Sequence, residues 1–378
     1  MADGPPAASR AAYLPALDSL RFFAFFSVFL THTLPKGHSF YASHSLPTAL
    51  GDFAAAGGFG VDLFFVLSGY LITDLLLKER DQSGRVDVKA FYVRRILRIW
   101  PLYFLALSLG VLFTALHWEA LTLRDVVGFS LLAGNWICAL YGYPFSFIFP
   151  LWSVSIEEQF YLSWALVVRA LERRGLAAVA AGVIVVANLS RALAVWHKAI
   201  PEYIWCSTFT RLDPIACGIL LAIGLRGRLP GLAAWKRAVL FAAGVTLWTL
   251  EGRLLLPDSS AAAAVLLQYP LAALAAVMMF LAALGPAERT GGLRGHPALV
   301  YLGRISYGLY VFHYLGITTA RHWFGLGEQT SLKFAGFWFG SLAWTVAAAA
   351  LSYRCFERPF LRLKGRFSRV TGNPPLRG

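Results

Sequence analysis

The sequence predicts an all-α, polytopic membrane protein, a helix bundle of about ten transmembrane helices with one additional re-entrant or interfacial segment. Three observations lead to this prediction. Of the 378 residues, 58% are hydrophobic and 14% are charged, and this charged fraction is well below that of a typical soluble domain. Mostly apolar stretches of about 20 residues, the length that crosses a bilayer, recur along the chain. The net charge is +14, and membrane proteins concentrate basic residues in their cytoplasmic loops.

Ten apolar stretches are predicted to cross the membrane, and the polar segments between them are too short for a soluble domain. The predicted spans are 16–34, 55–77, 99–118, 151–170, 175–196, 204–225, 237–256, 261–284, 299–320 and 333–353. A cytoplasmic segment, 1–15, precedes this transmembrane domain of residues 16–353, and a basic cytoplasmic tail, 354–378, follows it. We expect no signal peptide, because residues 1–16 are polar and contain prolines.

The stretch 126–156 carries no formal charge but is interrupted by an asparagine, a glycine and two prolines. If residues 126–141 crossed the membrane, the basic residues at 169–174 would lie on the side opposite the basic loop 78–98. A re-entrant or interfacial path instead puts every strongly basic loop and both termini on the cytoplasmic side. Irregular backbone at membrane depth must be covered by protein or line a wet cavity. We therefore expect this segment to line a site.

Composition and motifs exclude several classes of protein. The four cysteines show no close pairing and no histidine-rich surroundings, so we expect no metal site and no disulfide framework. The chain has no convincing signature of a soluble hydrolase, a metalloprotease or a nucleotide-driven pump. The positive charge could bind a polyanion, but the topology above explains it as an orientation signal, so we expect no nucleic-acid partner.

The first predicted span contains Asp18, Arg21 and His32. Arg21 and His32 are eleven residues apart, which places them about 20° from perfect alignment on one helix face and about 16 Å apart along the axis. Ionisable groups within lipid are unfavourable, so they usually face the protein interior and mark a functional site. The alternative is that Arg21 extends to the cytoplasmic interface and His32 caps the outer end.

A basic turn, Arg94, Arg95 and Arg98, directly precedes the third span and is followed by Trp100-Pro101-Leu102-Tyr103. Arg95 and Arg98 are neighbours on one helix face. Such a cluster can bind phosphates through paired hydrogen bonds. The alternative is an ordinary cytoplasmic flank of a membrane span, or a contact with anionic lipids.

Two adjacent carboxylates, Glu157 and Glu158, follow Trp152 and Ser153 near the start of the fourth span. Adjacent helical residues point about 100° apart, so the two cannot act as a facing pair. One of them is expected to face a cavity while the other stabilises the end of the helix. The alternative is a favourable interaction of both with the helix dipole.

Smaller polar groups occur in three other spans. Asp62 and Ser68 lie in the second span, and His313 lies deep in the ninth. Arg211 and Asp213 place opposite charges inside the sixth span. Because neither is tolerated alone in lipid, a satisfied ion pair is at least as good an explanation as catalysis.

Taken in order, these motifs resemble the membrane-bound acyltransferase-3 family across nearly the whole chain. Seven segments carry the resemblance: Leu17–Arg21 with His32, Asp62–Tyr70, Arg95–Tyr103, Trp152–Glu157, Arg211–Asp213 with Gly218, Gly303–His313, and Ser352-Tyr353 with Glu357 and Pro359. Two features depart from the family pattern. Tyr314 follows His313 where the family usually has a proline, and the 25 residues that follow the last predicted span in this sequence are too few for the additional esterase-like domain that some family members carry.

The resemblance implies an inner-membrane O-acyltransferase whose donor is cytoplasmic acyl-CoA, commonly acetyl-CoA. The implied acceptor is a hydroxyl of a sugar, in a surface glycan or a glycosylated small molecule. The family's leading catalytic candidate is the first-span histidine, here His32, and its basic motif is associated with the donor. Membrane lipids are the remaining expected partner, and no metal is expected.

These implications give a hypothesis for each site residue. The donor phosphates bind to Arg94, Arg95 and Arg98 with Tyr103 nearby, and Arg21 contacts the donor or orients the site. His32 acts as general base or as transient acyl carrier, and Glu157 positions His32 or the acceptor. The remaining candidates contribute to the acceptor site or to structure: Asp62, Ser68, Trp152, Ser153, Glu158, Arg211, Asp213 and His313.

A membrane transporter is the alternative function. Ten spans, one interrupted segment and buried charges also suit a substrate carrier, although the sequence shows no internal repeat. Transfer of label from acetyl-CoA would distinguish the enzyme from a carrier, which would take up substrate without acetylating it.

Overall fold

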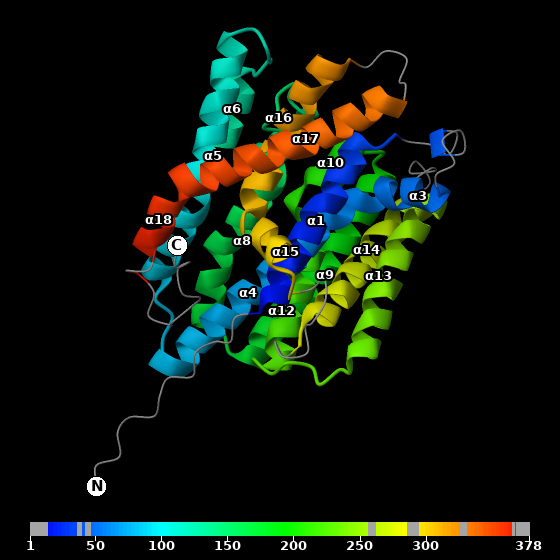
Figure 1. Cartoon of the computed structure of the whole chain (residues 1–378). Coiled ribbons are helices and arrows are strands. Elements are labelled where there is room, and N and C mark those ends of the chain that lie inside the picture. Colours follow the sequence, from blue (N-terminus) through cyan, green and yellow to red (C-terminus); the bar gives the residue numbers. More distant parts are fainter. Residues whose placement is uncertain are drawn as a thin grey trace.

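The computed structural model describes residues 14–35, 40–41, 47–255, 262–285, 295–325, 331–364 and 367. Most of the predicted N-terminal segment (1–13) and most of the predicted basic tail (365–366 and 368–378) therefore lie outside the described residues. Within the described residues the regular elements are helices, and most of them run roughly alongside one another in a bundle (Figure 1). The predicted all-α class is confirmed.

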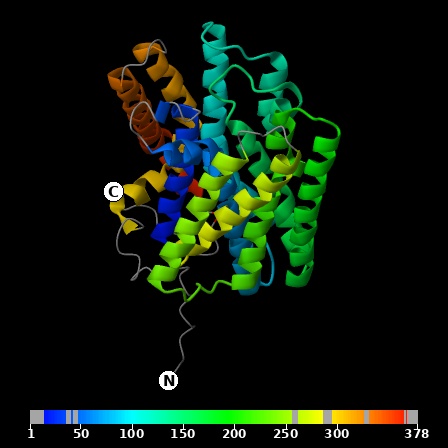
Figure 2. The same ribbon diagram turned by 90° about the vertical axis from the view of Figure 1, so that its right-hand side faces the viewer.

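Most predicted spans correspond to single helices close to the expected bounds, except that α5 begins well before its predicted span. These are α1 (Pro15–Thr33), α4 (Gly60–Ser83), α5 (Val88–Ala115), α8 (Leu151–Ala170), α9 (Arg173–Trp196), α13 (Ala234–Leu254), α14 (Ala262–Ala283) and α17 (Ser331–Ser352). Shorter elements flank two of them: α3 (Thr48–Ala56) and a 3-10 turn (Gly57–Phe59) precede α4, and a π turn (Tyr353–Glu357) and α18 (Arg358–Lys364) follow α17. α13 and α14 pack together on the flank away from α5 and α6 (Figures 1 and 2).

Five helical stretches among the described residues are long and apolar enough to cross a membrane. They are Thr48–Ser83, Val88–Ala115, Arg173–Trp196, Ala262–Ala283 and Leu332–Leu363. Other helices are shorter or carry several charges, as α8 does with its two adjacent glutamates. The structure therefore supports a membrane-embedded helical protein, while the number of about ten crossings stays a prediction.

Two predicted spans are interrupted. The span 204–225 consists of α10 (Pro201–Cys206), α11 (Thr208–Arg211) and α12 (Asp213–Leu225). Ser207 has an extended backbone, and Pro214 disfavours a continuous helix through the residue before it. The span 299–320 is likewise divided into α15 (Pro297–Arg304) and α16 (Ser306–Phe324).

The ambiguous stretch 126–156 forms two short helices and an irregular segment before α8 begins. α6 (Leu123–Ser130) and α7 (Gly134–Tyr141) have eight residues each, about 12 Å, too short to cross a bilayer. Figure 1 shows α6 beside the upper part of α5, at one end of the bundle. This geometry agrees with a re-entrant or interfacial segment and not with a complete crossing.

Close helix contacts at glycines set the positions of the functional helices. A Cβ atom on Gly69 of α4 would lie 2.1 Å from the carbonyl oxygen of Ile215, and one on Gly303 of α15 would lie 1.8 Å from that of Asp18. Only glycine allows the backbones to approach so closely, a common device in membrane helix bundles. The two contacts join α4 to α12 and α1 to α15.

Candidate active site

Two cavities lie between the helices. The larger, of about 1230 Å³, is lined in part by His32, and the smaller, of about 130 Å³, is lined by Arg21, Arg95 and Arg98. Val61 of α4 and Tyr310 of α16 line both cavities. The two spaces therefore meet at this pair of side chains.

The arginines of the smaller cavity come from α1 and α5. Because α5 begins at Val88, well before the predicted span, Arg95 and Arg98 stand on the helix itself and share one face. The Arg95 guanidinium lies 5.7 Å from the ring centre of Phe91 and 5.9 Å from that of Tyr161. The smaller cavity thus presents a concentrated positive charge.

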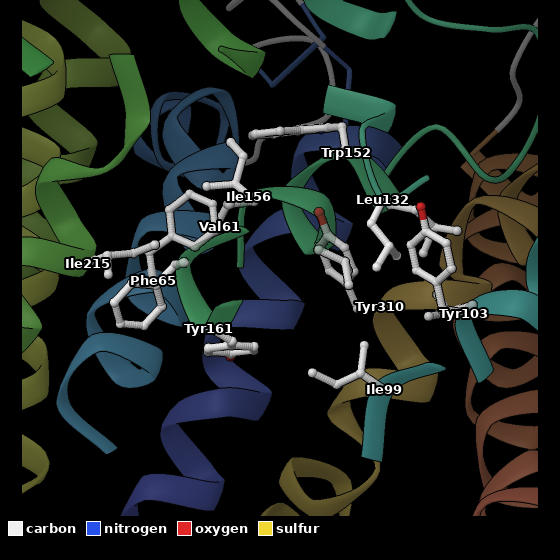
Figure 3. Packing of buried hydrophobic residues seen from close by; sticks show 14 of the residues in the cluster. Val61, Phe65, Ile99, Tyr103, Leu132, Trp152, Ile156, Tyr161, Ile215 and Tyr310 are labelled. Atoms are coloured by element: carbon white, nitrogen blue, oxygen red, sulfur yellow. The ribbon is translucent and has the colours of Figure 1, made fainter. Parts of the chain in front are cut away.

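Glu157 also lines the smaller cavity, and its carboxylate is held by two hydroxyls. Ser68 Oγ donates to Glu157 Oε1 at 2.8 Å, and the Tyr161 hydroxyl donates to Glu157 Oε2 at 3.0 Å. Figure 3 shows Phe65 and Tyr161 on one side of this cavity, opposite Ile99 and Tyr310. Glu157 is therefore placed among the arginines, and not in the wall of the larger cavity beside His32.

The neighbouring residues of α8 point in different directions, as the helical period requires. Glu158 faces α5, where its Oε2 accepts a hydrogen bond of 2.8 Å from Trp100 Nε1. Trp152 lines the larger cavity and Ser153 the smaller one. Ser153 Oγ is 2.8 Å from the Tyr310 hydroxyl, at the boundary between the two cavities.

His32 forms a histidine pair with His313. His32 Nδ1 is 3.1 Å from His313 Nε2, and His313 Nδ1 is 2.5 Å from the carbonyl oxygen of Tyr310. His313 is completely buried, whereas His32 is half-buried and packs edge-on against Phe149 and Tyr314. Two spans far apart in the sequence are thereby joined at the larger cavity.

The hydrogen-bond pattern fixes the proton positions of a neutral pair. A carbonyl oxygen only accepts, so His313 Nδ1 donates to Tyr310, and His313 Nε2 is left as an acceptor. His32 Nδ1 then donates to His313, which makes His32 Nε2 the unprotonated nitrogen of this tautomer. An unprotonated imidazole nitrogen has the chemistry of a general base.

Arg211 and Asp213 do not bind each other, so the ion pair between them that was one explanation of these charges is not formed. Arg211 binds Asp62 of α4 at 3.0 Å, and Arg191 of α9 binds both oxygens of Asp213 at 3.0 and 2.9 Å. Arg211 also stacks on Trp205 at 4.4 Å. The helix break at Leu212 lies between Arg211 and Asp213, whose side chains bind partners on two different helices. All four charged groups are buried, and their ion pairs hold the helices together.

Two predicted donor residues lie outside the walls of both cavities. Arg94 makes a buried ion pair of 2.8 Å with Glu79 and donates to the carbonyl oxygen of Phe367. The Tyr103 hydroxyl donates to the carbonyl oxygen of Phe129. Arg94 points about 100° away from Arg95 on the same helix, so it anchors α5 instead of facing the cavity.

Residues that the motifs did not indicate form much of the larger cavity. They include Trp118, Glu119, Tyr143, Phe145, Trp205, Arg321 and Trp323. Glu119 accepts from Ser146 Oγ at 2.5 Å and from the Phe147 amide at 2.9 Å, which ties the segment before α8 to the end of α5. Burial raises the pKa of Glu119, and these two hydrogen bonds partly oppose the shift. Aromatic residues in the predicted outer segments were the available sequence signal.

Comparison with known sequences identifies relatives. Residues 14–354 match the acyltransferase-3 family model, described as an acyltransferase domain. The chain is 30% identical over 390 residues to the Bacillus subtilis protein named "Putative peptidoglycan O-acetyltransferase YrhL", covering 93% of this chain and 55% of that protein. It is 26% identical over 387 residues to the Staphylococcus aureus protein "O-acetyltransferase OatA", covering 93% of this chain and 58% of that protein.

The chain therefore spans somewhat more than half the length of these relatives. No solved structure matches the chain.

Proposed function

The chain belongs to the membrane-bound acyltransferase-3 family, and from this premise we propose that it is an O-acyltransferase that moves an acetyl group from cytoplasmic acyl-CoA to a hydroxyl of a sugar-containing acceptor. The observation that carries the proposal is the pair of cavities that meet at Val61 and Tyr310. One has an arginine-rich wall, and the other is lined by His32, which pairs with His313. Donor and acceptor can thus approach one reaction point from opposite sides.

The donor side is the smaller cavity. Arg95 and Arg98 supply guanidinium groups that have no ion pair among the described residues, and Arg21 adds a third one that also binds Asp18 at 2.7 Å. Guanidinium groups bind phosphate oxygens in pairs of hydrogen bonds. In this arrangement the phosphates of acyl-CoA bind at Arg95 and Arg98, and the thioester end extends toward Val61 and Tyr310.

His32 carries out the proton transfer. His32 Nε2 takes the proton of the acceptor hydroxyl while the hydroxyl oxygen attacks the thioester carbonyl carbon. The carbon–sulfur bond then breaks, and the proton passes from His32 Nε2 to the departing sulfur, which leaves as the free thiol. In the alternative order, His32 carries the acyl group transiently before the hydroxyl attacks. His313 keeps His32 in the required tautomer in either case.

The acceptor side is the larger cavity. Its wall contains several large aromatic side chains, among them Trp118, Trp205 and Trp323. Pockets of this kind, apolar with a few polar groups, are typical of ligand-binding sites. The name of the Bacillus subtilis relative refers to peptidoglycan, a carbohydrate polymer, and this likeness supports a sugar-containing acceptor here.

The test uses the full chain in sealed vesicles with labelled acetyl-CoA outside and a mixture of glycans inside. We expect label and the mass of an acetyl group to appear on a glycan, together with free CoA thiol outside. The His32→Ala protein is the matched control and should transfer far less label. Uptake of label without acetylation would instead identify a carrier and refute the proposal.

A further inference from the structure

Five arginines have a buried Nε nitrogen without a hydrogen-bond partner in the described part of the chain, and they form two groups. The five are Arg94, Arg95, Arg191, Arg211 and Arg321. In Arg94, Arg191 and Arg211 the terminal nitrogens bind Glu79, Asp213 and Asp62, respectively. Arg95 and Arg321 form no ion pair with any described residue, and each lines one cavity.

This division is informative because a buried guanidinium nitrogen without a hydrogen-bond partner is unfavourable, and a nearby anion offsets that cost. The three paired arginines meet that requirement within the chain. Arg95 already has a proposed partner, the phosphates of the donor. Arg321 has none, although it lines the cavity that contains His32.

Arg321 lies on α16, C-terminal to His313, and lines the larger cavity. It stands in the last turn of α16, and Tyr314 and Thr318 of the same helix line the cavity between it and His313. Eight residues separate His313 from Arg321, which is about 12 Å along the helix axis. A group bound at Arg321 therefore belongs to a different part of the acceptor from the hydroxyl that reacts at His32.

The dipole of α16 offers a simpler explanation for a cation at this position. The helix dipole accounts for the position of the adjacent His322, which is exposed. It does not account for the burial of the Arg321 Nε at a cavity wall. Glu119 is the one acidic residue among the described residues lining this cavity, and its two oxygens already accept hydrogen bonds from Ser146 and Phe147. The Arg321 guanidinium thus remains available to a ligand.

The surroundings of Arg321 suit a sugar chain. Trp118 and Trp323 line the same cavity and are 69% and 79% exposed. Large aromatic side chains exposed at a cavity are characteristic of binding surfaces. An aromatic wall combined with one unpaired guanidinium group fits a glycan that carries a negative charge.

We propose that Arg321 binds an anionic group, a carboxylate or a phosphate, of the acceptor glycan. The proposal rests on the proposed function, because it takes the larger cavity as the acceptor side. Guanidinium groups form paired hydrogen bonds with both kinds of anion. The acceptor class is thereby narrowed to acidic glycans.

The test measures binding without acyl transfer, by tryptophan fluorescence of the full chain in lipid nanodiscs. Three tetrasaccharide probes are compared: a neutral N-acetylglucosamine oligomer, the same oligomer with one phosphate, and a glucuronate-containing oligomer. At least one acidic probe should bind about tenfold or more tightly than the neutral probe, as expected for hydrogen bonds to a charged group. The tighter of the two acidic probes identifies the anion.

Variants assign this preference to Arg321. Arg321→Gln should bind acidic and neutral probes equally, and Arg321→Lys should keep part of the preference, because it retains the charge but loses the paired geometry. Arg253→Gln, at an exposed arginine on α13, is the matched control and should bind as the unchanged protein does.

Equal binding of acidic and neutral probes, an acid preference that survives in Arg321→Gln, or no binding of any probe would each overturn the proposal. The proposed function fails separately. If the acidic probe binds through Arg321 but no acetyl group is ever transferred, the anion site stands and the acyltransferase assignment falls. If transfer proceeds and Arg321→Gln changes neither probe binding nor the acceptor KM, the acyltransferase assignment stands and the anion site is refuted.

Discussion

The two cavities differ in size, in charge and in the kind of side chain that forms them. The smaller, about 130 Å³, is lined by three arginines and a glutamate held by two hydroxyls. The larger cavity, about 1230 Å³, has a wall rich in aromatic side chains that also contains Arg321 and His32. Under the proposed function, this difference means that the donor is selected by its phosphate charge in a narrow space, and the acceptor by its shape and a single charge contact.

The largest effect on kcat is expected from replacing His32, the residue proposed to take the proton of the acceptor hydroxyl. His32→Ala removes the proton acceptor, so kcat should fall about 10²- to 10⁴-fold. Binding of a non-hydrolysable acyl-CoA analogue should be unchanged, because His32 lines the larger cavity only. Steady-state turnover tests the expected fall in kcat, and analogue binding tests the unchanged donor affinity. Turnover close to that of the wild-type protein would exclude His32 from catalysis.

Next in size is closure of the junction between the cavities. Val61→Trp places a large ring where both cavities meet and should reduce acetyl transfer about 100-fold by displacing the thioester. Donor and acceptor should still bind separately. Val61→Ala is the control and should retain most activity. If Val61→Trp retains full activity, the two ligands do not meet at this junction.

The donor side is tested by removing its charge. Arg95→Ala combined with Arg98→Ala should raise the KM for acyl-CoA about 10- to 100-fold, because hydrogen bonds between charged groups are lost. The KM for the acceptor should stay the same. Isothermal titration with CoA measures the same loss directly. An unaltered CoA affinity would show that these arginines serve only membrane orientation.

A smaller effect is expected from the partner of His32. His313→Leu removes the acceptor that fixes the His32 tautomer and should lower kcat about tenfold without changing either KM. His313→Asn retains a side-chain acceptor and should recover part of the rate. The pH profile of kcat should shift in His313→Leu, since the environment of the His32 ring changes. Loss of folded protein without any change in this profile would assign His313 a structural role alone.

The smallest effect on activity belongs to Arg94, the immediate neighbour of Arg95. Arg94→Ala breaks a buried ion pair and should destabilise the fold by about 3–5 kcal/mol. The KM for acyl-CoA of the folded fraction should not change, because Arg94 faces Glu79. Thermal unfolding and donor titration separate these outcomes. A weakened donor affinity at unchanged stability would place Arg94 in the donor site after all.

The helices were largely predictable, and the reason is visible in α8. Its observed bounds, Leu151–Ala170, equal the predicted span, because Pro150 marks the start of the mostly apolar stretch and the basic residues from Arg169 onward mark its end. The breaks at Ser207 and Ile305 were not predicted. Each interrupts an apolar stretch whose composition favours a continuous helix.

Sequence reasoning selected some of the residues that line the two cavities but did not predict how they are grouped. Sequence reasoning selected Arg95, Arg98 and His32, and the structure places the two arginines in one cavity and the histidine in the other. It placed Arg94 with the donor and paired Arg211 with Asp213, and in both cases the structure gives a partner on a different helix. Arg321 belongs to none of the sequence motifs. Only the structure distinguishes it, because no acidic side chain among the described residues pairs with it there.

The sequence by itself determined the helical class, the position of most helices and the chemical types present in the site. Those properties follow from hydrophobic length and from the rarity of charge in apolar segments, which act locally along the chain. The tertiary structure alone decided which charge meets which, that His32 meets His313, and that Arg321 is left facing a cavity. Such contacts join residues hundreds of positions apart, and only the packing of the helices sets their distances.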